Sequence, residues 1–83
     1  ITTIPKEIGQ LSNLKQLFLN HNQIITIPKE IERLSNLKEL YLSYNQITTC
    51  DFVANLINLE ELYLNNNKIK TWNFVSSLSK LRI

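Results

Sequence analysis

The sequence predicts a solenoid, a fold in which the chain coils repeatedly and successive coils stack on one another. Two observations predict it, and the first is a repeat. Residues 4–24, IPKEIGQLSNLKQLFLNHNQI, return after 23 positions as IPKEIERLSNLKELYLSYNQI. A more divergent copy follows after a further 22 positions, and a fourth unit begins at residue 72. A nearly constant period of this length is typical of stacked repeat architectures.

The second observation is that the apolar positions of the units form columns. A single unit has only a thin apolar face, which equivalent units bury by stacking. We therefore expect one continuous core built column by column. The strand and corner columns are Leu14/Leu37/Leu59/Leu81, Leu17/Leu40/Leu62, Leu19/Leu42/Leu64 and Ile1/Ile24/Ile47/Ile69. The return-path columns are Ile4/Ile27/Cys50/Trp72, Ile8/Ile31/Val53/Val75 and Leu11/Leu34/Leu56/Leu78.

Each complete unit contains one strand followed by a corner, as in residues 37–47, LKELYLSYNQI. Residues two apart lie on the same side of a strand, so Leu40 and Leu42 should face inward. Their neighbours Glu39, Tyr41 and Ser43 should then face outward. An asparagine column marks the corner, where a side-chain amide can donate to and accept from backbone groups that a tight coil leaves unpaired. Its members are Asn22, Asn45 and Asn67.

The pattern LxxLxLxxNxI, present in three complete copies, resembles the leucine-rich repeat family over essentially the whole chain. The IPKEI units are similar to the typical 23-residue class. The later units are similar to the 22-residue repeats of a protein phosphatase 1 regulatory subunit. The resemblance implies an α/β solenoid, a right-handed superhelix with a concave parallel β-sheet and 3₁₀, short helical or extended segments on the convex side.

The residues of the return path predict how the convex side is built. Pro5 and Pro28 fix φ near −65° and lack an N–H donor, which suits an irregular segment. The shorter units replace the proline and add Phe52 and Phe74, which we expect to pack a tighter 3₁₀ or α turn against the core. Gly9 has no equivalent glycine in the next unit, which argues against a required left-handed backbone there.

The domain organisation follows from the repeat boundaries. We expect one segment with a partial unit at residues 1–13, full coils at about 14–36, 37–58 and 59–80, and a partial unit at 81–83. The chain starts at Ile1, contains no methionine and has no polar capping unit at either end. We therefore expect a piece of a longer array that can self-associate through its open edges.

Composition excludes several classes of function. No apolar run approaches the ~20 residues that cross a bilayer, so no membrane insertion is expected. A net charge of +2, with acidic and basic residues alternating, argues against nucleic acid as a partner. The single Cys50 excludes a disulfide framework and a multi-cysteine metal site. With the absence of a glycosylation sequon, it favours a reducing compartment such as the cytoplasm.

The chain offers few groups for catalysis. Cys50 lies in a column of apolar residues, which predicts a buried and unreactive thiol. His21 shares its column with Tyr44 and Asn66, which favours surface contact over metal ligation. The side chains of the adjacent Glu60 and Glu61 should diverge on a strand, which argues against a paired-carboxylate site. No phosphate-binding loop or metal-ligand spacing occurs, so we expect neither an enzyme nor a cofactor site.

The outward strand positions are the candidates for binding. The column Phe18/Tyr41/Tyr63 is aromatic in every complete unit. Coils ~4.8 Å apart would let these rings stack. One interpretation is a structural ladder that contributes roughly 0.2–1 kcal/mol per pair. The other is a binding stripe, since tyrosine and phenylalanine are enriched at interfaces. The two interpretations are compatible, because a stiff ladder is a preorganised surface.

The flanking columns predict the chemistry of the partner. Glu39 and Glu61 would form an acidic border, which favours a partner with basic residues nearby and disfavours nucleic acid. Lys15 and Lys38 precede this border and are expected to be solvated or to shield the sheet. The full set of expected contact residues is Phe18, Tyr41, Tyr63, Tyr44, His21, Gln16, Glu39, Glu61, Asn20, Ser43 and Asn65.

Besides a purely structural role, as an assembly element whose open edges join other chains, two functional hypotheses stand after the sequence analysis. The first is a non-catalytic scaffold that binds a protein or peptide on its concave face. The second is the recognition region of a larger enzyme or enzyme regulator, such as a ligase, a kinase or a phosphatase regulator.

Overall fold

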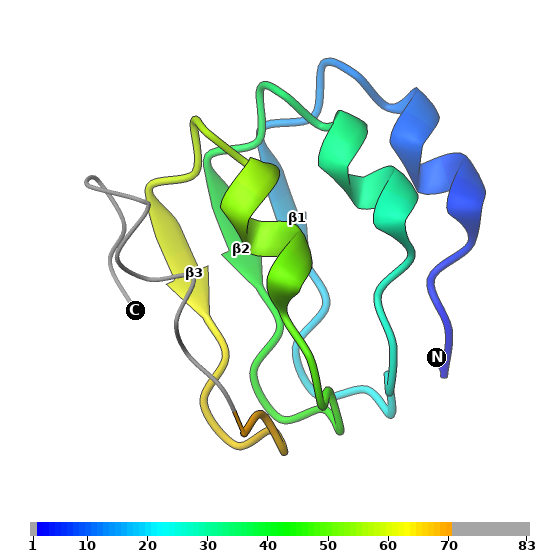
Figure 1. Cartoon of the computed structure of the whole chain (residues 1–83), viewed down its shortest axis with the longest axis vertical. Helices are drawn as coiled ribbons and strands as arrows, with labels where there is room; N and C mark the ends of the chain where they lie inside the picture. The colour runs from blue at the N-terminus through cyan, green and yellow to red at the C-terminus, as the bar shows by residue number, and fades with distance from the viewer. Residues whose placement is uncertain (1, 71–83) are drawn as a thin grey trace.

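The computed structural model describes residues 2–70, in which each coil contributes one short 3₁₀ helix and one strand (Figure 1). The elements, in chain order, are η1 (Lys6–Gln10), β1 (Gln16–Phe18), η2 (Lys29–Arg33), β2 (Glu39–Tyr41), η3 (Asp51–Asn55) and β3 (Glu61–Tyr63). The predictions for Ile1, Trp72, Phe74, Val75, Leu78 and Leu81 lie outside the described residues.

The strands form a parallel sheet in the order β1-β2-β3. Gln16 pairs with Glu39, which in turn pairs with Glu61, so the register offset equals the repeat period of the sequence at each step. Equivalent positions of successive units therefore lie side by side. The predicted solenoid with a parallel sheet is confirmed.

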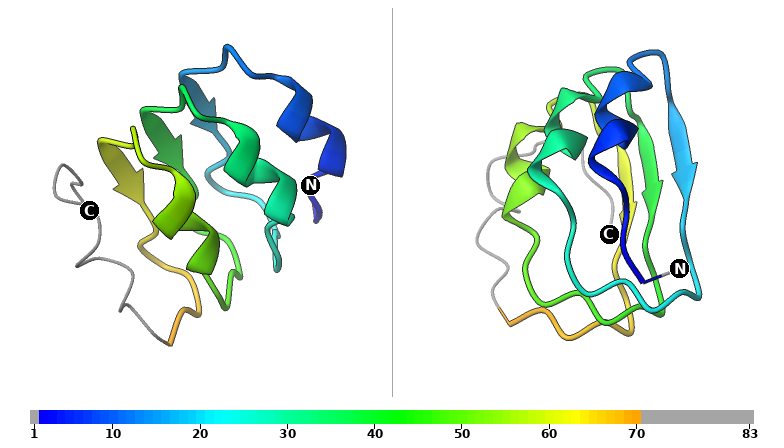
Figure 2. Two further views of the ribbon diagram at one scale, coloured as in Figure 1. Left: turned by 45° about the horizontal axis from the view of Figure 1, so that its top comes forward. Right: turned by 90° about the vertical axis from the view of Figure 1, so that its right-hand side faces the viewer.

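The helices cover the side of the core opposite the sheet (Figure 2). Pro5 and Pro28 occupy the position just before η1 and η2 in an extended conformation, with φ of −68° and −67°. The helix η3 begins after Cys50, which has φ of −139° and is not a proline. All three helices have 5 residues, so the units with proline form the same 3₁₀ helix as the unit without it. The expectation that the proline units would be irregular is therefore wrong. Proline sets the direction of the chain before the helix, where its missing N–H is not needed.

Gly9 is required for the close packing of η1 on η2. Among the described residues no glycine has a positive φ, in agreement with the sequence analysis. A Cβ atom on Gly9 would instead lie 2.7 Å from the backbone oxygen of Glu30 and 3.2 Å from Cδ of Arg33. The absence of a side chain, and not backbone freedom, explains this glycine.

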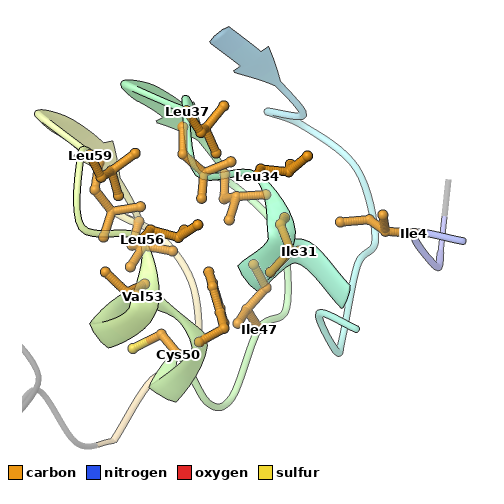
Figure 3. Close-up of a cluster of buried hydrophobic side chains, with 14 of the residues drawn as sticks. Ile4, Ile31, Leu34, Leu37, Ile47, Cys50, Val53, Leu56 and Leu59 are labelled. Atoms are coloured by element: carbon orange, nitrogen blue, oxygen red, sulfur yellow. The ribbon is translucent and has the colours of Figure 1, made fainter. Parts of the chain in front are cut away.

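The core lies between the helices and the sheet (Figure 3). The inward strand positions of the second coil, Leu37, Leu40 and Leu42, are completely buried. The return path contributes Ile31, Leu34, Val53 and Leu56, each 0–1% exposed, and Phe52 is also buried. No helix of the described part is long or apolar enough to span a membrane.

The first coil is less covered than the second. Leu14, Leu17 and Leu19 are only partly buried, and Leu11, predicted in a core column, is 51% exposed. A hollow of about 400 Å³ opens beside Leu11 and Leu14. In the described sheet β1 is an edge strand paired only with β2, so no coil at 2–70 covers its other side.

Candidate functional site

The aromatic column forms a continuous stack along the outer face of the sheet. The Phe18 and Tyr41 ring centroids are 4.5 Å apart, and those of Tyr41 and Tyr63 are 4.8 Å apart. The interplanar angles are 13° and 11°, so neighbouring rings stack face against face. Phe18, at the end of the stack, is 61% exposed, whereas Tyr41 and Tyr63 are partly buried.

The acidic border is tied to the aromatic stack. The hydroxyl of Tyr41 donates to Oε1 of Glu39 at 2.7 Å, and the hydroxyl of Tyr63 donates to Oε1 of Glu61 at 2.8 Å. Nε2 of Gln16 donates to Oε2 of Glu39 at 2.9 Å. Glu39 and Glu61 are thus each fixed by a hydrogen bond from the hydroxyl of the tyrosine two residues later in the same strand.

These hydrogen bonds change the acidity of the groups involved. Donation from Gln16 and then from Tyr41 lowers the pKa of Glu39, because both bonds favour the charged carboxylate. The same hydrogen bond has the opposite effect on the pKa of its donor, the phenol of Tyr41. The bond to Glu39, reinforced by desolvation and nearby negative charge, raises the pKa of Tyr41 to about 12. The carboxylate is therefore charged, and the phenol neutral, over the whole neutral range.

The polar border on the other side of the rings is partly structural. Oδ1 of Asn20 accepts from the backbone N–H of Ser43 at 2.7 Å, and Oγ of Ser43 donates to Oδ1 of Asn65. Ser43 is only 6% exposed. The prediction that Ser43 faces solvent is wrong, because the neighbouring asparagines hold it at the inter-coil seam. Asn65 is exposed and Asn20 is partly buried.

The column after this border has an unusual backbone. His21, Tyr44 and Asn66 have φ of 59°, 60° and 62°, the left-handed region that asparagine and histidine enter more readily than bulky residues. The His21 and Tyr44 rings stack with centroids 4.6 Å apart. The sequence analysis did not find this turn. The fixed position just before the corner asparagine was the available signal.

The corner asparagines join successive coils. Nδ2 of Asn45 donates to the carbonyl of Leu19 in the preceding coil at 2.9 Å and to that of Leu42 in its own coil at 3.0 Å. Its Oδ1 accepts from the backbone N–H of Ile24 at 3.1 Å. Asn67 repeats the pattern with Leu42, Leu64 and Ile47. Nδ2 of Asn22 donates to the Leu19 carbonyl at 3.0 Å.

A second asparagine column at the other end of the strands was not predicted. Nδ2 of Asn36 donates to the carbonyl of Ser12 at 3.0 Å, and Nδ2 of Asn58 donates to that of Ser35 at 2.7 Å. The Asn-Leu pair that precedes every strand, at residues 13–14, 36–37 and 58–59, was the signal in the sequence. These bonds clamp each coil to the one before it.

The groups considered for catalysis do not converge. Cys50 is 2% exposed, and burial, with the negative charge of Asp51, raises the pKa of its thiol to about 11. His21 is exposed and stacks on Tyr44, whereas Cys50 is part of the buried core. Within residues 2–70 no group of three or more histidine, cysteine or acidic side chains could hold a metal ion.

Comparison with known proteins settles the family. The family model described as a leucine-rich repeat matches residues 1–47, more than half of the chain. The model described as two copies of leucine-rich repeats matches residues 35–81. The chain belongs to the leucine-rich repeat family. That family is typically a non-enzymatic scaffold for protein–protein interaction. The comparison with curated protein sequences gives no match.

Similar solved structures come from bacteria and plants. A leucine-rich repeat protein of Leptospira interrogans is 35% identical over 99% of this chain, with a TM-score of 0.85. An internalin of Listeria monocytogenes is 28% identical over 95% of the chain, with a TM-score of 0.86. This chain spans 22% and 23% of those two chains.

A third structure contains a bound partner. It is the ectodomain of the Arabidopsis thaliana membrane receptor kinase GASSHO1/SCHENGEN3 in complex with CASPARIAN STRIP INTEGRITY FACTOR 2. It is 34% identical over 96% of this leucine-rich repeat chain, with a TM-score of 0.83, and this chain spans 10% of it. The assignment of single units to the 23- and 22-residue classes stays a prediction.

Proposed function

We propose that this leucine-rich repeat chain is a non-catalytic scaffold that binds a protein or peptide on the concave face of its sheet. The observation that carries the proposal is the stacked column of Phe18, Tyr41 and Tyr63 on the outer face. The stack holds three aromatic rings in one arrangement before any partner arrives. Binding to such a surface costs little side-chain entropy, because the rings and their carboxylates are already ordered.

The geometry of the stack restricts what can bind. Both faces of Tyr41 lie against neighbouring rings, so a partner over the centre of the stack meets a ring edge, whereas Phe18 and Tyr63 each have one face against Tyr41. Proteins that bind single-stranded nucleic acid stack the bases on open aromatic ring faces. A peptide that packs its apolar or polar groups against ring edges does not need an open ring face. The charged Glu39 and Glu61 beside the rings favour basic residues in that peptide.

The proposal is tested with peptides selected on the folded chain from a random display library and then titrated as synthetic peptides. Tyr41→Ala and Tyr63→Ala should each weaken binding by about 1–3 kcal/mol if the rings are centres of the interface. Ile57→Ala is the matched control, because Ile57 is 72% exposed but lies between η3 and β3, outside the sheet face. Unchanged affinity with both tyrosines replaced would leave the stack only a structural role.

A second candidate function is the recognition region of a larger enzyme or enzyme regulator. The receptor kinase ectodomain among the similar structures favours it, since there the repeats form part of a kinase protein. The intact mass of the native polypeptide tests this candidate. A mass equal to that of these 83 residues would reject it. Self-association through the open edges, expected from the sequence, stays a prediction.

A further inference from the structure

Two of the chain's 3 tyrosines, Tyr41 and Tyr63, stack on each other in the sheet. Their ring centroids are 4.8 Å apart and their ring planes are inclined by only 11°. The two residues are direct partners in the register of β2 and β3, so the repeat brings them together although they are distant in the sequence. The remaining tyrosine, Tyr44, stacks on His21.

The two phenols are held in matching positions. Tyr41 donates its hydroxyl proton to Oε1 of Glu39 at 2.7 Å, and Tyr63 donates to Oε1 of Glu61 at 2.8 Å. Because the strands are parallel and pair residue by residue, the same bond in each strand gives the two rings the same direction. Equivalent ring atoms therefore face each other across the strand spacing of ~4.8 Å. The ortho carbons beside the two hydroxyls are among these facing atoms.

Each hydroxyl of the pair already has a proton acceptor, which favours one-electron oxidation of the ring. Removing an electron from a phenol makes its O–H proton strongly acidic, so oxidation is easier where a positioned base takes that proton. The carboxylates of Glu39 and Glu61 are such bases. Both tyrosines are only partly buried, so a small oxidant reaches them from solvent. Phe18, the third ring of the stack, has no hydroxyl and cannot form a phenoxyl radical.

From this arrangement we infer that Tyr41 and Tyr63 are a site of oxidative cross-linking, where a one-electron oxidant joins the two rings as dityrosine. Each ring gives one electron to the oxidant and its hydroxyl proton to the adjacent carboxylate, which leaves two phenoxyl radicals. The radicals form a carbon–carbon bond between their ortho carbons. The two ortho hydrogens then leave as protons, each carboxylic acid returns a proton to its phenol oxygen, and both rings become aromatic again. In total two electrons pass to two equivalents of oxidant and two protons to water.

The sheet makes this coupling a reaction between two groups that are already positioned. Such groups react as if at a very high local concentration, whereas free radicals must first meet by diffusion. Changes in the side-chain torsions bring the ortho carbons together while β2 and β3 stay paired, because rings on neighbouring strands already lie next to each other. The product ties the second coil covalently to the third. The inference does not depend on the proposed function.

The test is photo-oxidation of the dilute folded chain with ruthenium tris-bipyridine and persulfate, in which photogenerated ruthenium(III) is the one-electron oxidant. The expected product is a monomer that has lost two hydrogens and shows dityrosine fluorescence. Mass spectrometry of its digest should map the cross-link to Tyr41 and Tyr63. A sample unfolded in urea should give at least about tenfold less of this product, because the rings are no longer held together. A cross-link at Tyr44, or equal yields from the folded and unfolded chain, would overturn the inference.

Three variants, each checked for its fold by circular dichroism, separate the roles of the groups. Tyr63→Phe keeps a ring in the stack but removes one hydroxyl, and it should abolish the product. Tyr44→Phe is the matched control and should leave the yield unchanged, because Tyr44 is exposed and stacks on His21. Glu61→Gln replaces a proton acceptor by an amide of nearly the same shape, and it should slow the coupling at least about tenfold. Product from Tyr63→Phe, loss of product from Tyr44→Phe, or an unchanged rate in Glu61→Gln would each contradict the proposal.

Discussion

The first and second coils have nearly the same sequence but different environments. Leu17 and Leu40 occupy the same place in the motif and pair in the sheet, yet Leu40 is completely buried and Leu17 is only partly buried. The difference follows from position in the stack, since Leu40 has a coil on each side. Burial in a solenoid is therefore a property of the neighbours as much as of the residue.

The same two coils also differ in how the outer face is held. The second coil has Glu39 and Tyr41, whose side chains bond to each other, and the first has Gln16 and Phe18. Phe18 has no hydroxyl to bond to Gln16, whose amide donates sideways to Glu39 instead. The first coil thus supports the second, which makes Glu39 the most constrained carboxylate of the face.

The largest expected difference between the coils concerns the paired leucines. Leu40→Ala should lower the free energy of unfolding by about 2–5 kcal/mol, because it leaves a void in a closed core. Leu17→Ala should cost clearly less, because its site is open on one side. Urea denaturation of both variants measures this. Equal losses would mean that the edge of the first coil is covered in solution.

The packing of η1 against η2 gives an intermediate effect. Gly9→Ala should lower the free energy of unfolding by about 1–3 kcal/mol, because the added methyl group meets the Glu30 oxygen and the helices must separate. Ala54 occupies the equivalent position in η3, where it is exposed, unlike the buried Gly9, and already carries a Cβ atom. As the control, Ala54→Gly should cost no more than about 1 kcal/mol. A neutral Gly9→Ala would show that η1 is free to shift.

The smallest effect is the ionisation of Tyr41. Its raised pKa means that the bond to Glu39 stabilises the folded chain fully below the ordinary tyrosine pKa of 10.0, and that this stabilisation is lost as the pH rises towards 12. The lowered pKa of Glu39 removes stability at the other extreme, as the pH falls below about 4.5. Absorbance at 295 nm, as the difference between wild type and Tyr41→Phe, should show a midpoint near 12.

A second variant ties this titration to the comparison of the coils. The phenol introduced by Phe18→Tyr should titrate at a lower pH than Tyr41, because Gln16 is neutral where the second coil has a carboxylate. Identical midpoints for the two phenols would mean that solvent, and not the neighbouring carboxylate, sets their acidity.

Parts of the candidate face could be predicted because they follow from alternation along a strand. The stacking of Phe18, Tyr41 and Tyr63 is such a feature, since register follows from a constant repeat. The burial of Ser43 could not be predicted in this way. It depends on the side chains of Asn20 and Asn65 closing over it from neighbouring coils, and alternation alone places it outward.

The left-handed backbone at Tyr44 and the second asparagine column were also missed. Tyrosine as a residue type gives no signal for a positive φ, so only the fixed position before the corner asparagine pointed to the value of 60° that the turn from strand to corner has at Tyr44. Asn36 reads as a surface residue in the sequence. The repeated Asn-Leu pair marks the position, but the Ser12 carbonyl that accepts from Asn36 lies in the preceding coil and is not part of that pattern.

The sequence by itself determined the solenoid, its period, the parallel register and the residues of the core columns, because stacking identical units is the only way to bury so thin an apolar face. Tertiary structure decided which members of a column are covered, which carboxylates are already bound and why Gly9 lacks a side chain. Those properties depend on atoms contributed by the adjacent coils, and the repeat pattern does not contain their positions.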